Sequence, residues 1–417
     1  MPAYLPRYSE RLVKEALYDT RVVIINGARQ AGKSTLVSRI LRDHPGAVLH
    51  RLDRADERAS AQRDPDRFVA HDGLVAIDEV QRVPDLVLAV KARVDDRPLP
   101  GSFLLTGSAR LLGLRQLPDA LVGRSETVEL WPFAQCEMER TVPSFVDEIF
   151  SGAPTFSGVG AETVEGYFAR VTRGGFPEAV ERTERRRARF FESYLADLID
   201  RDVIQLAEIQ RRDQLHRLIE LLSARAAAPL VIDQVAGELR VPAATVERYV
   251  GLLEEVFLIK RLPAWSASTT ARAVRQRKLV FVDSGIASHV RGLSLARLVR
   301  QEAAGGGLLE NFVLSELARL CAFSDERVTL RHYRTRDGIE VDAVLETADG
   351  RVVGVEVKSA TSVRDDDFRG LRELQRRVPD RFVAGFVMHC GKSVLPFGPN
   401  LTAIPIDALW SGPLERA

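Results

Sequence analysis

The hydrophobic positions of the first 140 residues follow two alternating patterns. Short apolar runs bounded by glycine or polar residues are typical of buried strands, and between them stretches such as 36–44 (LVSRILRDH) repeat apolar residues at helical spacing. Four strands are predicted from the runs: 21–26, 46–53, 74–80 and 102–108. Because strands that alternate with helices form parallel sheets covered on both faces, residues 1–150 are predicted to be an α/β domain.

The strand pattern fades after about residue 160, and residues 151–300 are predicted to form a helical middle domain. Within it, 229–262 contains two helical stretches separated by a short turn at Val241 and Pro242, followed by a β-rich tail. Five apolar positions would seal the two crossed helices: Val235, Leu239, Val246, Val250 and Leu253. This pattern is typical of a winged helix-turn-helix.

A third pattern, over residues 301–417, predicts a compact α/β domain with a mixed sheet. An apolar helix at 308–320 precedes three strand-like runs, a helix and a last strand: 327–334, 339–346, 352–360, 368–377 and 382–389. Asp349 and Gly350 have the composition of a hairpin turn, so the second and third of these strands are expected to pair antiparallel.

Composition narrows the class of protein. The chain has 417 residues, 45% hydrophobic and 28% charged, which fits two or three globular domains and excludes long disorder. It has no run of 18 apolar residues, and its N-terminus is charged where a signal peptide needs an apolar stretch. We therefore expect no membrane span and a cytoplasmic protein. The three cysteines are far apart and odd in number, as expected of buried thiols rather than disulfides or a zinc site.

The net charge is only +1, but it is unevenly placed. Residues 261–300 hold eight basic residues and one acid, a net of +7. Four of these basic residues are candidates for contacts to nucleic-acid phosphates, and Trp265 for stacking on a base: Arg272, Arg275, Arg277 and Lys278. DNA is therefore an expected partner, with a merely solvated basic surface as the alternative.

Only seven of the 59 basic residues are lysines. An ammonium is a compact charge with a tunable pKa, whereas guanidinium is a planar fork, so a lysine in this arginine-rich chain invites a chemical reason. Two of the seven, Lys33 and Lys358, fall inside the two strongest motifs.

The first motif, GARQAGKS at 27–34, matches GxxxxGK[ST] between an apolar strand and a helix. Backbone N–H groups of the loop and the helix N-terminus would cradle phosphates, Lys33 would reach the β and γ oxygens, and Ser34 would bind Mg²⁺. ATP and Mg²⁺ are the expected ligands. The nucleotide-binding residues predicted here are Gly27, Ala28, Arg29, Gln30, Ala31, Gly32, Lys33, Ser34 and Thr35.

Two acids follow the apolar strand at 74–77. Asp78 is expected to hold Mg²⁺, and Glu79 to polarise the water that attacks the γ-phosphate. The next strand ends with Thr106 and Ser108, whose hydroxyls could orient that water or sense the γ-phosphate, although a strand-terminal turn explains the same residues nearly as well.

The second motif lies near the C-terminus. Residues two apart share a strand face, so Glu340 and Asp342 point to one side of their strand and Glu356 and Lys358 to one side of the next. If the strands pair through the hairpin, Asp342, Glu356 and Lys358 converge, with Glu310 on the preceding helix. Asp342 and Glu356 could hold Mg²⁺ or Mn²⁺ at a phosphodiester, and Lys358 could activate water. The alternative is a hairpin with cross-strand charge pairs.

Several segments together resemble the AAA+-type ATPases of bacteria and archaea that carry a C-terminal domain of unknown function: GARQAGKST, LVAIDEV, FLLTGSARLL, LVGR followed by ETVELWPFAQCE, and GGFP. The likeness covers nearly the whole chain. It implies an AAA+ P-loop fold for the first domain and makes Arg124 a candidate γ-phosphate contact, in cis or from a neighbouring subunit. The class usually has asparagine where this chain has the Thr106 and Ser108 strand end.

The spacing from Asp342 to Glu356 and Lys358 resembles the PD-(D/E)xK restriction-endonuclease-like fold, and Glu310 matches the extra helix acid of its resolvase-like branch. The chain departs from that pattern in having no proline before Asp342, and Pro379 where exonuclease relatives have tyrosine. The resemblance implies a metal-dependent nuclease, with Glu310, Asp342, Glu356 and Lys358 as catalytic residues.

Three hypotheses follow. The first is an ATP-hydrolysing, Mg²⁺-dependent protein that acts on DNA and cleaves phosphodiester bonds with its C-terminal domain. The second is an ATP-dependent switch whose last domain is inactive and only binds nucleic acid or protein. The third, a P-loop kinase for a small molecule, is disfavoured because Glu79 beside Asp78 favours attack by water. The sequence leaves the oligomeric state open.

Overall fold

The computed structural model describes residues 4–107, 121–151, 154, 156, 159–203, 212–267 and 276–411. The chain divides into two compact units. Unit 1 comprises Met1–Pro132 with Glu255–Phe257, and unit 2 comprises Phe133–Glu254 with Leu258–Ala417. Within the described ranges, none of the helices combines the length and the apolar character needed to cross a membrane.

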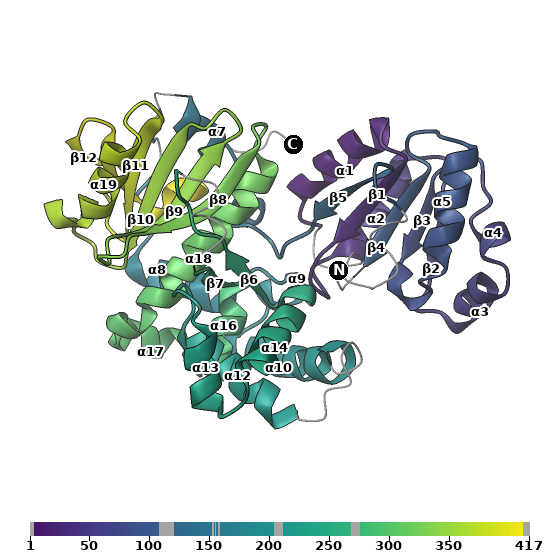
Figure 1. Ribbon diagram of the computed structural model, residues 1–417, viewed down its shortest axis with the longest axis horizontal. Helices are drawn as coiled ribbons and strands as arrows, with labels where there is room; N and C mark the ends of the chain where they lie inside the picture. Colours follow the sequence, from purple (N-terminus) through teal and green to yellow (C-terminus); the bar gives the residue numbers. More distant parts are fainter. Residues whose placement is uncertain are drawn as a thin grey trace. The chain divides into compact units, whose positions relative to one another are not determined.

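Unit 1 is built on a parallel sheet with the strand order β2-β3-β4-β1-β5 (Figure 1). Its strands are β1 Val22–Asn26, β2 Val48–Arg51, β3 Val75–Asp78, β4 Phe103–Gly107 and β5 Ser125–Glu129. The four strands expected from the apolar runs are confirmed. β5 is an additional edge strand whose sequence, SETVE, is too polar to be predicted.

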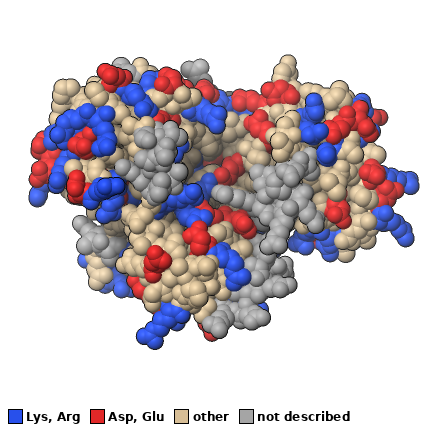
Figure 2. Space-filling view, viewed as in Figure 1, with Lys and Arg blue, Asp and Glu red and all other residues tan. Residues whose placement is uncertain are grey.

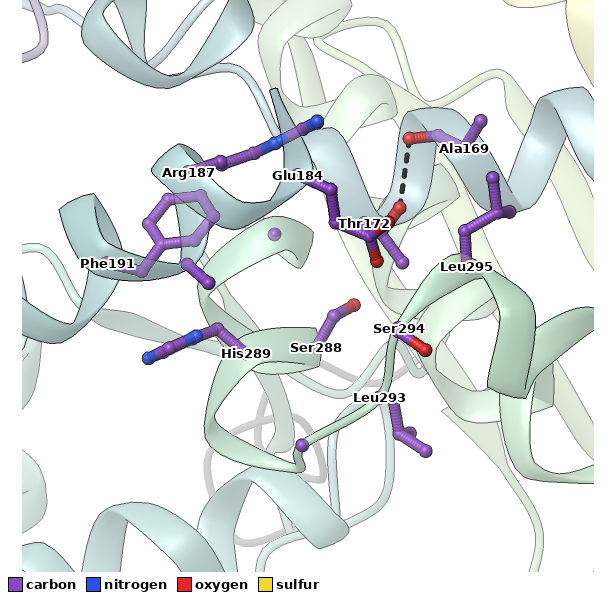
Figure 3. Close-up of a pocket in the computed structure, with 13 residues that line it drawn as sticks. Ala169, Thr172, Glu184, Arg187, Phe191, Ser288, His289, Leu293, Ser294 and Leu295 are labelled. Atoms are coloured by element: carbon purple, nitrogen blue, oxygen red, sulfur yellow. Dashed lines mark hydrogen bonds between the residues drawn. The ribbon is translucent and has the colours of Figure 1, made fainter. Parts of the chain in front are cut away.

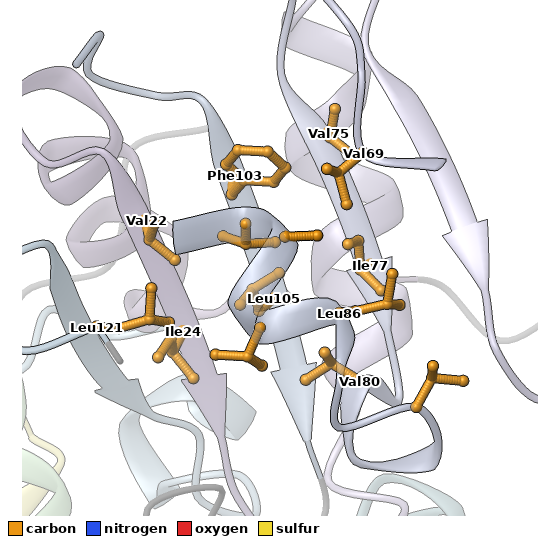
Figure 4. Close-up of a cluster of buried hydrophobic side chains, with 14 of the residues drawn as sticks. Val22, Ile24, Val69, Val75, Ile77, Val80, Leu86, Phe103, Leu105 and Leu121 are labelled. Carbon is orange, nitrogen blue, oxygen red and sulfur yellow. The ribbon is translucent and has the colours of Figure 1, made fainter. Parts of the chain in front are cut away.

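Alternate residues of these strands are buried on opposite faces of the sheet. Val22 and Ile24 pack with α5 (Leu86–Asp96) in the cluster drawn in Figure 4, whereas Val23 and Ile25 pack with α1 (Tyr8–Asp19) and α2 (Lys33–Ile40). Further helical segments among the described residues of unit 1 are η1 Leu41–Asp43, α3 Ala55–Arg63, α4 Pro65–Phe68 and η2 Val80–Arg82. The sheet is therefore covered on both faces, as the runs of Val and Ile predict.

The first part of unit 2 is helical. Its segments are α6 Gln135–Glu139, α7 Phe145–Phe150, α8 Val164–Arg173, α9 Pro177–Val180, α10 Glu184–Asp197, the π-helical η4 Leu198–Val203, α12 Arg212–Ala224, α13 Ile232–Leu239, α14 Ala243–Glu255, α16 Ser284–Val290 and α17 Leu295–Arg300. The GGFP segment leads from α8 into α9 and packs on Asp283: the N–H of Gly175 donates to Asp283 Oδ2 at 2.7 Å, and a Cβ on Gly174 would clash with the same carboxylate.

The region expected to be a winged helix-turn-helix contains two helices, α13 and α14, followed by β6 (Ile259–Leu262) and β7 (Lys278–Phe281), which pair antiparallel. The five apolar residues chosen from the sequence to seal the helices are all buried, each at most 4% exposed. These features agree with the predicted helical pair, while the winged-helix interpretation stays a prediction.

The second part of unit 2 is a mixed sheet with the order β12-β13-β11-β10-β9-β8 (Figure 1). Its elements are α18 Glu302–Phe323, β8 Val328–Arg334, β9 Glu340–Thr347, β10 Val352–Lys358, η5 Asp365–Phe368, α19 Arg369–Arg377, β11 Phe382–His389, β12 Leu395–Gly398, β13 Leu401–Pro405 and η6 Ile406–Leu409. β9 and β10 pair antiparallel, which confirms the hairpin, and Gly350 in the turn has a φ of +89°. The sequence pattern does not predict β12 and β13.

Candidate functional site

The phosphate-binding motif lies where β1 ends and α2 begins. Its two glycines lie at positions where a side chain would clash or the backbone would be strained. A Cβ on Gly27 would lie 2.1 Å from the carbonyl oxygen of Leu130, and Gly32 precedes α2 with a φ of +102°. The loop therefore has the tight path that directs backbone N–H groups toward a bound anion.

The ammonium of Lys33 is held over this loop. Its side chain is buried, and Nζ donates to the carbonyl oxygens of Gly27 at 2.8 Å and Ala28 at 2.9 Å. Ser34 and Thr35 follow in the first turn of α2 and are exposed. The structure thus brings the predicted lysine and hydroxyl side chains to one end of the sheet.

Arg7 supports the loop from outside the motif. Its guanidinium is 6% exposed and donates to the carbonyl oxygen of Ala31 at 2.9 Å and to that of Trp131. The residue thereby joins the phosphate loop to the segment after β5. Sequence reasoning missed Arg7, because one arginine among 52 carries no distinguishing pattern.

Asp78 and Glu79 lie at the carboxyl end of β3. The hydroxyl of Thr106, on the adjacent β4, donates to Asp78 Oδ1 and accepts the N–H of Glu79 at 3.1 Å. Glu79 has a φ of +61°, in the left-handed region, and its Oε2 accepts from Gln81 Nε2 at 2.6 Å. Thr106 therefore holds the carboxylate of Asp78 and the backbone of Glu79, while the water-orienting or sensing role expected for its hydroxyl stays a prediction.

The remaining two predicted nucleotide contacts have different outcomes. Ser108 lies outside the described residues. Arg124 precedes β5 at the amino ends of the strands, where Val22 N–H donates to its carbonyl oxygen, whereas the phosphate loop follows the carboxyl end of β1. Its guanidinium pairs with both oxygens of Asp95. The cis role of Arg124 therefore does not fit this structure, and contact from a neighbouring subunit stays a prediction.

A second candidate site lies in unit 2 around Lys278, the first residue of β7. This lysine is fully buried. Its Nζ lies 2.6 Å from Glu310 Oε1 of α18, and 3.0 Å each from Glu340 Oε1 and Asp342 Oδ1 of β9. Glu310, Glu340 and Asp342, called here the acid cluster, therefore surround an ammonium group supplied by the chain itself.

Burial and charge compete in this cluster. Burial raises the pKa of Glu310 well above its usual value, and the charge of Asp342 raises it further. Burial also disfavours charge on Asp342, but Lys278 and its hydrogen bonds outweigh this and lower its pKa. The same carboxylates raise the pKa of Lys278 although burial opposes it. The three carboxylates therefore favour the charged form of Lys278.

The other two predicted members lie beside the acid cluster. Lys358 Nζ contacts Glu356 Oε1 at 2.9 Å, and burial, followed by the charge of Asp342, raises the pKa of Glu356 to about 8. The backbone N–H of Val357 donates to Asp342 Oδ2 at 2.9 Å. The structure therefore gathers Glu310, Asp342, Glu356 and Lys358 in one region, as the strand pattern predicts.

The contacts of Asp342 bear on the metal site expected at Asp342 and Glu356. Asp342 uses Oδ1 for Lys278 and Oδ2 for Val357 N–H, so both oxygens already have donors. Among the described residues, no group of three or more His, Cys, Asp or Glu is arranged to hold a metal ion. Lys278 therefore occupies the side of Asp342 that faces Glu310 and Glu340. Glu356 Oε2 is buried with no hydrogen-bond donor among the described residues, so a Mg²⁺ or Mn²⁺ site at Asp342 and Glu356 stays a prediction.

Two further expectations about the basic segment are wrong. Lys278 cannot contact nucleic-acid phosphates, since its side chain is fully buried, and Trp265 cannot stack on a base, since it is fully buried in the core of the C-terminal sheet. Arg272 and Arg275 lie outside the described residues, and Arg277 is exposed. Sequence reasoning assigned Lys278 to a basic surface and missed its place among the acids, although its being one of only seven lysines was the available signal.

The surface charges are mixed on the face that Figure 2 shows, where Lys and Arg side chains are interspersed with Asp and Glu. α19 illustrates this: its Arg372 pairs with Asp365 and its Arg376 with Glu373. These arginines are largely neutralised by neighbours, so α19 is not an unpaired basic surface.

Unit 2 also contains a pocket of about 250 Å³ among α8, α10, α16 and the turn before α17 (Figure 3). Arg187 and His289 are among its lining residues, and burial lowers the pKa of both. Thr172, another lining residue, donates to backbone oxygens of its own helix, including that of Ala169. The pocket wall thus mixes apolar surface with polar groups that have partners within the protein.

Family models of known proteins match three parts of the chain. Residues 19–139 match a family model described as an AAA domain. Residues 164–297 and 305–409 match two models described as domains of unknown function, DUF8612 and DUF4143. The parallel sheet with its phosphate loop falls within the first match.

Two relatives and one solved structure are similar over much of the chain. The uncharacterized proteins Mb2031c of Mycobacterium bovis and Rv2008c of Mycobacterium tuberculosis are each 27% identical over 404 residues, which is 95% of this chain and 82% of theirs. The Walker-type ATPase PABY2304 of Pyrococcus abyssi is similar with a TM-score of 0.42 and 16% identity, over 69% of this chain and 96% of that one. From the AAA match and the geometry of the loop, unit 1 contains an AAA+-type P-loop ATPase domain.

Proposed function

We propose that unit 1 binds Mg²⁺–ATP and hydrolyses it, and that Glu79 activates the attacking water. The observation that carries this is the bond pattern of Thr106 on β4, the strand next to β1, which ends in the phosphate loop. Its hydroxyl bonds to Asp78 Oδ1 and to the N–H of Glu79 at the end of β3. Lys33 would bind the β- and γ-phosphates.

Magnesium fits the residues present. The hydroxyl of Ser34 and the carboxylate of Asp78 are oxygen donors at the same end of the sheet, and oxygen ligands are those that Mg²⁺ prefers. When bound, the ion neutralises charge that develops on the β- and γ-oxygens. Glu79 would accept the proton of the water from its left-handed position beyond β3.

Two substitutions test this assignment. Lys33→Ala should abolish nucleotide binding, whereas Glu79→Gln should retain binding and lose turnover, because only Glu79 touches the water. Lys14→Ala on α1 and Glu126→Gln on β5 are matched controls on exposed or ion-paired surface positions. Hydrolysis by Glu79→Gln at the wild-type rate would show that another group activates the water.

For unit 2 we infer a binding role in an ATP-dependent switch rather than phosphodiester cleavage. The observation that favours the switch over the nuclease is the ammonium of Lys278 within hydrogen-bonding distance of Glu310 and Asp342. Plasmid, nicked and single-stranded DNA incubated with Mg²⁺ or Mn²⁺, with and without ATP, should remain intact. Cleavage that disappears in Asp342→Asn would restore the nuclease hypothesis.

DNA remains the proposed partner of this switch, through exposed arginines of the basic segment such as Arg277, Arg297 and Arg300. Binding through phosphates should be largely independent of sequence and should weaken as salt rises. Reversal of all three to glutamate should lower affinity for every sequence alike and reduce the salt dependence. Unchanged affinity for duplex and single strands at low salt would indicate a protein partner instead.

A further inference from the structure

The acid cluster and Lys278 come from three different elements of unit 2. β7 provides Lys278, α18 provides Glu310, and β9 provides Glu340 and Asp342. Asn311, fully buried, accepts the N–H of Phe281 at 2.7 Å and donates to its carbonyl oxygen at 3.1 Å. This pair of hydrogen bonds joins α18 to β7 next to the cluster. It therefore helps to hold Lys278 of β7 beside Glu310 of α18.

Cations of the chain itself contact the carboxylates of this region. Glu340, Asp342 and Glu356 face three cations: Lys278, Lys358 at 2.9 Å from Glu356, and Arg334 at 3.4 Å from Glu340. The carboxylates of the region therefore already have cationic partners, and the one shared by Glu310, Glu340 and Asp342 is the ammonium of Lys278.

We propose that the ammonium of Lys278 is the resident cation of the acid cluster and excludes divalent metal ions from it. The two occupants compete for one volume. Divalent metals lie roughly 2.0–2.6 Å from carboxylate oxygens. The oxygens of Glu310, Glu340 and Asp342 that would bind such an ion already lie 2.6–3.0 Å from Nζ. A metal at their centre would overlap the ammonium nitrogen, so it can enter only when Lys278 leaves.

The inference assigns a function to Lys278 that deepens the switch proposed for unit 2, on which it rests, and it is independent of the ATP chemistry of unit 1. It predicts that a lysine-to-alanine change alone converts the cluster into a site for a divalent ion. The carboxylates would then lack their cation and would have room for a metal with its remaining waters.

The test uses the full chain without nucleotide and Mn²⁺ as the probe, followed by electron paramagnetic resonance and calorimetric titration. Lys278→Ala should bind Mn²⁺ on the order of tenfold or more tightly than wild type, and the double variant Lys278→Ala/Asp342→Asn should lose that gain. Lys278→Arg, which keeps the charge, should resemble wild type. Any weak binding at Asp78 is common to all four proteins and cancels in the comparison.

Thermal unfolding guards against a variant that merely folds poorly. Lys278→Ala should melt lower than wild type, and Mn²⁺ should raise its melting temperature while leaving that of wild type nearly unchanged, because a ligand stabilises only the state that binds it. A folded Lys278→Ala protein that binds no Mn²⁺, or one that does not fold with or without Mn²⁺, would overturn the proposal.

Equal Mn²⁺ affinity in wild type and Lys278→Ala, reduced in both by Asp342→Asn, would likewise overturn it. These outcomes are distinct from failure of the proposed function of unit 2. Wild-type DNA cleavage would end the switch proposal, whereas metal binding is measured here in the absence of DNA and nucleotide.

Discussion

Lys33, the first residue of α2, and Lys278, the first residue of β7, are both buried lysines, yet they have different surroundings. Lys33 donates to two neutral carbonyl oxygens of its own loop, next to the exposed Ser34 and Thr35. Lys278 contacts three carboxylates and is fully buried. An ammonium bound by neutral dipoles can still attract an anion, whereas one already compensated by carboxylates cannot. The comparison teaches that the type of partner, more than the lysine, distinguishes a binding site from a closed ion pair.

The same substitution in both places gives the largest expected contrast. Lys278→Met should lower the free energy of unfolding by about 3–5 kcal/mol, because removal of one partner leaves buried carboxylates uncompensated. Lys33→Met should lower it less, by about 1–2 kcal/mol, since the hydrogen bonds of Nζ that are described here go to neutral carbonyl oxygens. Urea unfolding followed by tryptophan fluorescence measures both, with Trp131 in unit 1 and Trp265 and Trp410 in unit 2. Equal losses would remove the distinction between the two sites.

His332 sharpens the comparison through pH. Burial lowers the pKa of His332 to about 4, and the positive charge of Lys278 contributes to the same shift. Below its usual pKa of about 6.5 the unfolded chain binds a proton that the folded chain does not. Stability that is present above pH 6.5 is therefore lost as the pH falls toward 4, by about 3 kcal/mol at most.

His332→Gln should flatten this pH dependence, since glutamine can donate to the carbonyl of Gln276 as the ring does but does not titrate. Nuclear magnetic resonance of the imidazole should also show its pKa rising in Lys278→Met. If that pKa is unchanged, Lys278 is not charged in the folded protein.

An effect of intermediate size is expected for Thr106→Val in the candidate nucleotide site of unit 1. The change removes the hydroxyl that joins Asp78 to the N–H of Glu79, so turnover should fall roughly tenfold through loss of acid positioning. The dissociation constant of ATP should change little, because the described hydrogen bonds of the Thr106 hydroxyl go to Asp78 and Glu79 and not to the phosphate loop. Thr106→Ser should restore turnover, and a variant that instead loses ATP binding would place Thr106 at the nucleotide.

The smallest effect is expected at Arg124. Because its guanidinium pairs with Asp95 at the amino ends of the strands, Arg124→Ala should change the ATP dissociation constant of the monomer by less than about twofold. Asp95→Ala is the matched control. Turnover that rises with protein concentration in wild type but not in Arg124→Ala would indicate that the residue acts across subunits.

The sequence predicts the central strands of unit 1 because β1, β3 and β4 are buried on both faces and appear as unbroken apolar runs. It does not predict β5, whose edge position permits polar residues. Lys33 and Asp78 are also predictable, because each belongs to a short motif directly after one of these apolar runs. Lys278 is not, since its partners Glu310 and Asp342 lie 32 and 64 positions away, and only the folded chain shows that they meet.

These separations also have a consequence for the order of folding. On a growing chain, Lys278 is synthesised well before Asp342, so its ammonium stays hydrated until α18 and β9 have docked on β7. Contacts of such long range form late, after the transition state has gathered its local structure. We therefore expect removal of the buried lysine to raise the unfolding rate constant far more than it lowers the folding rate constant.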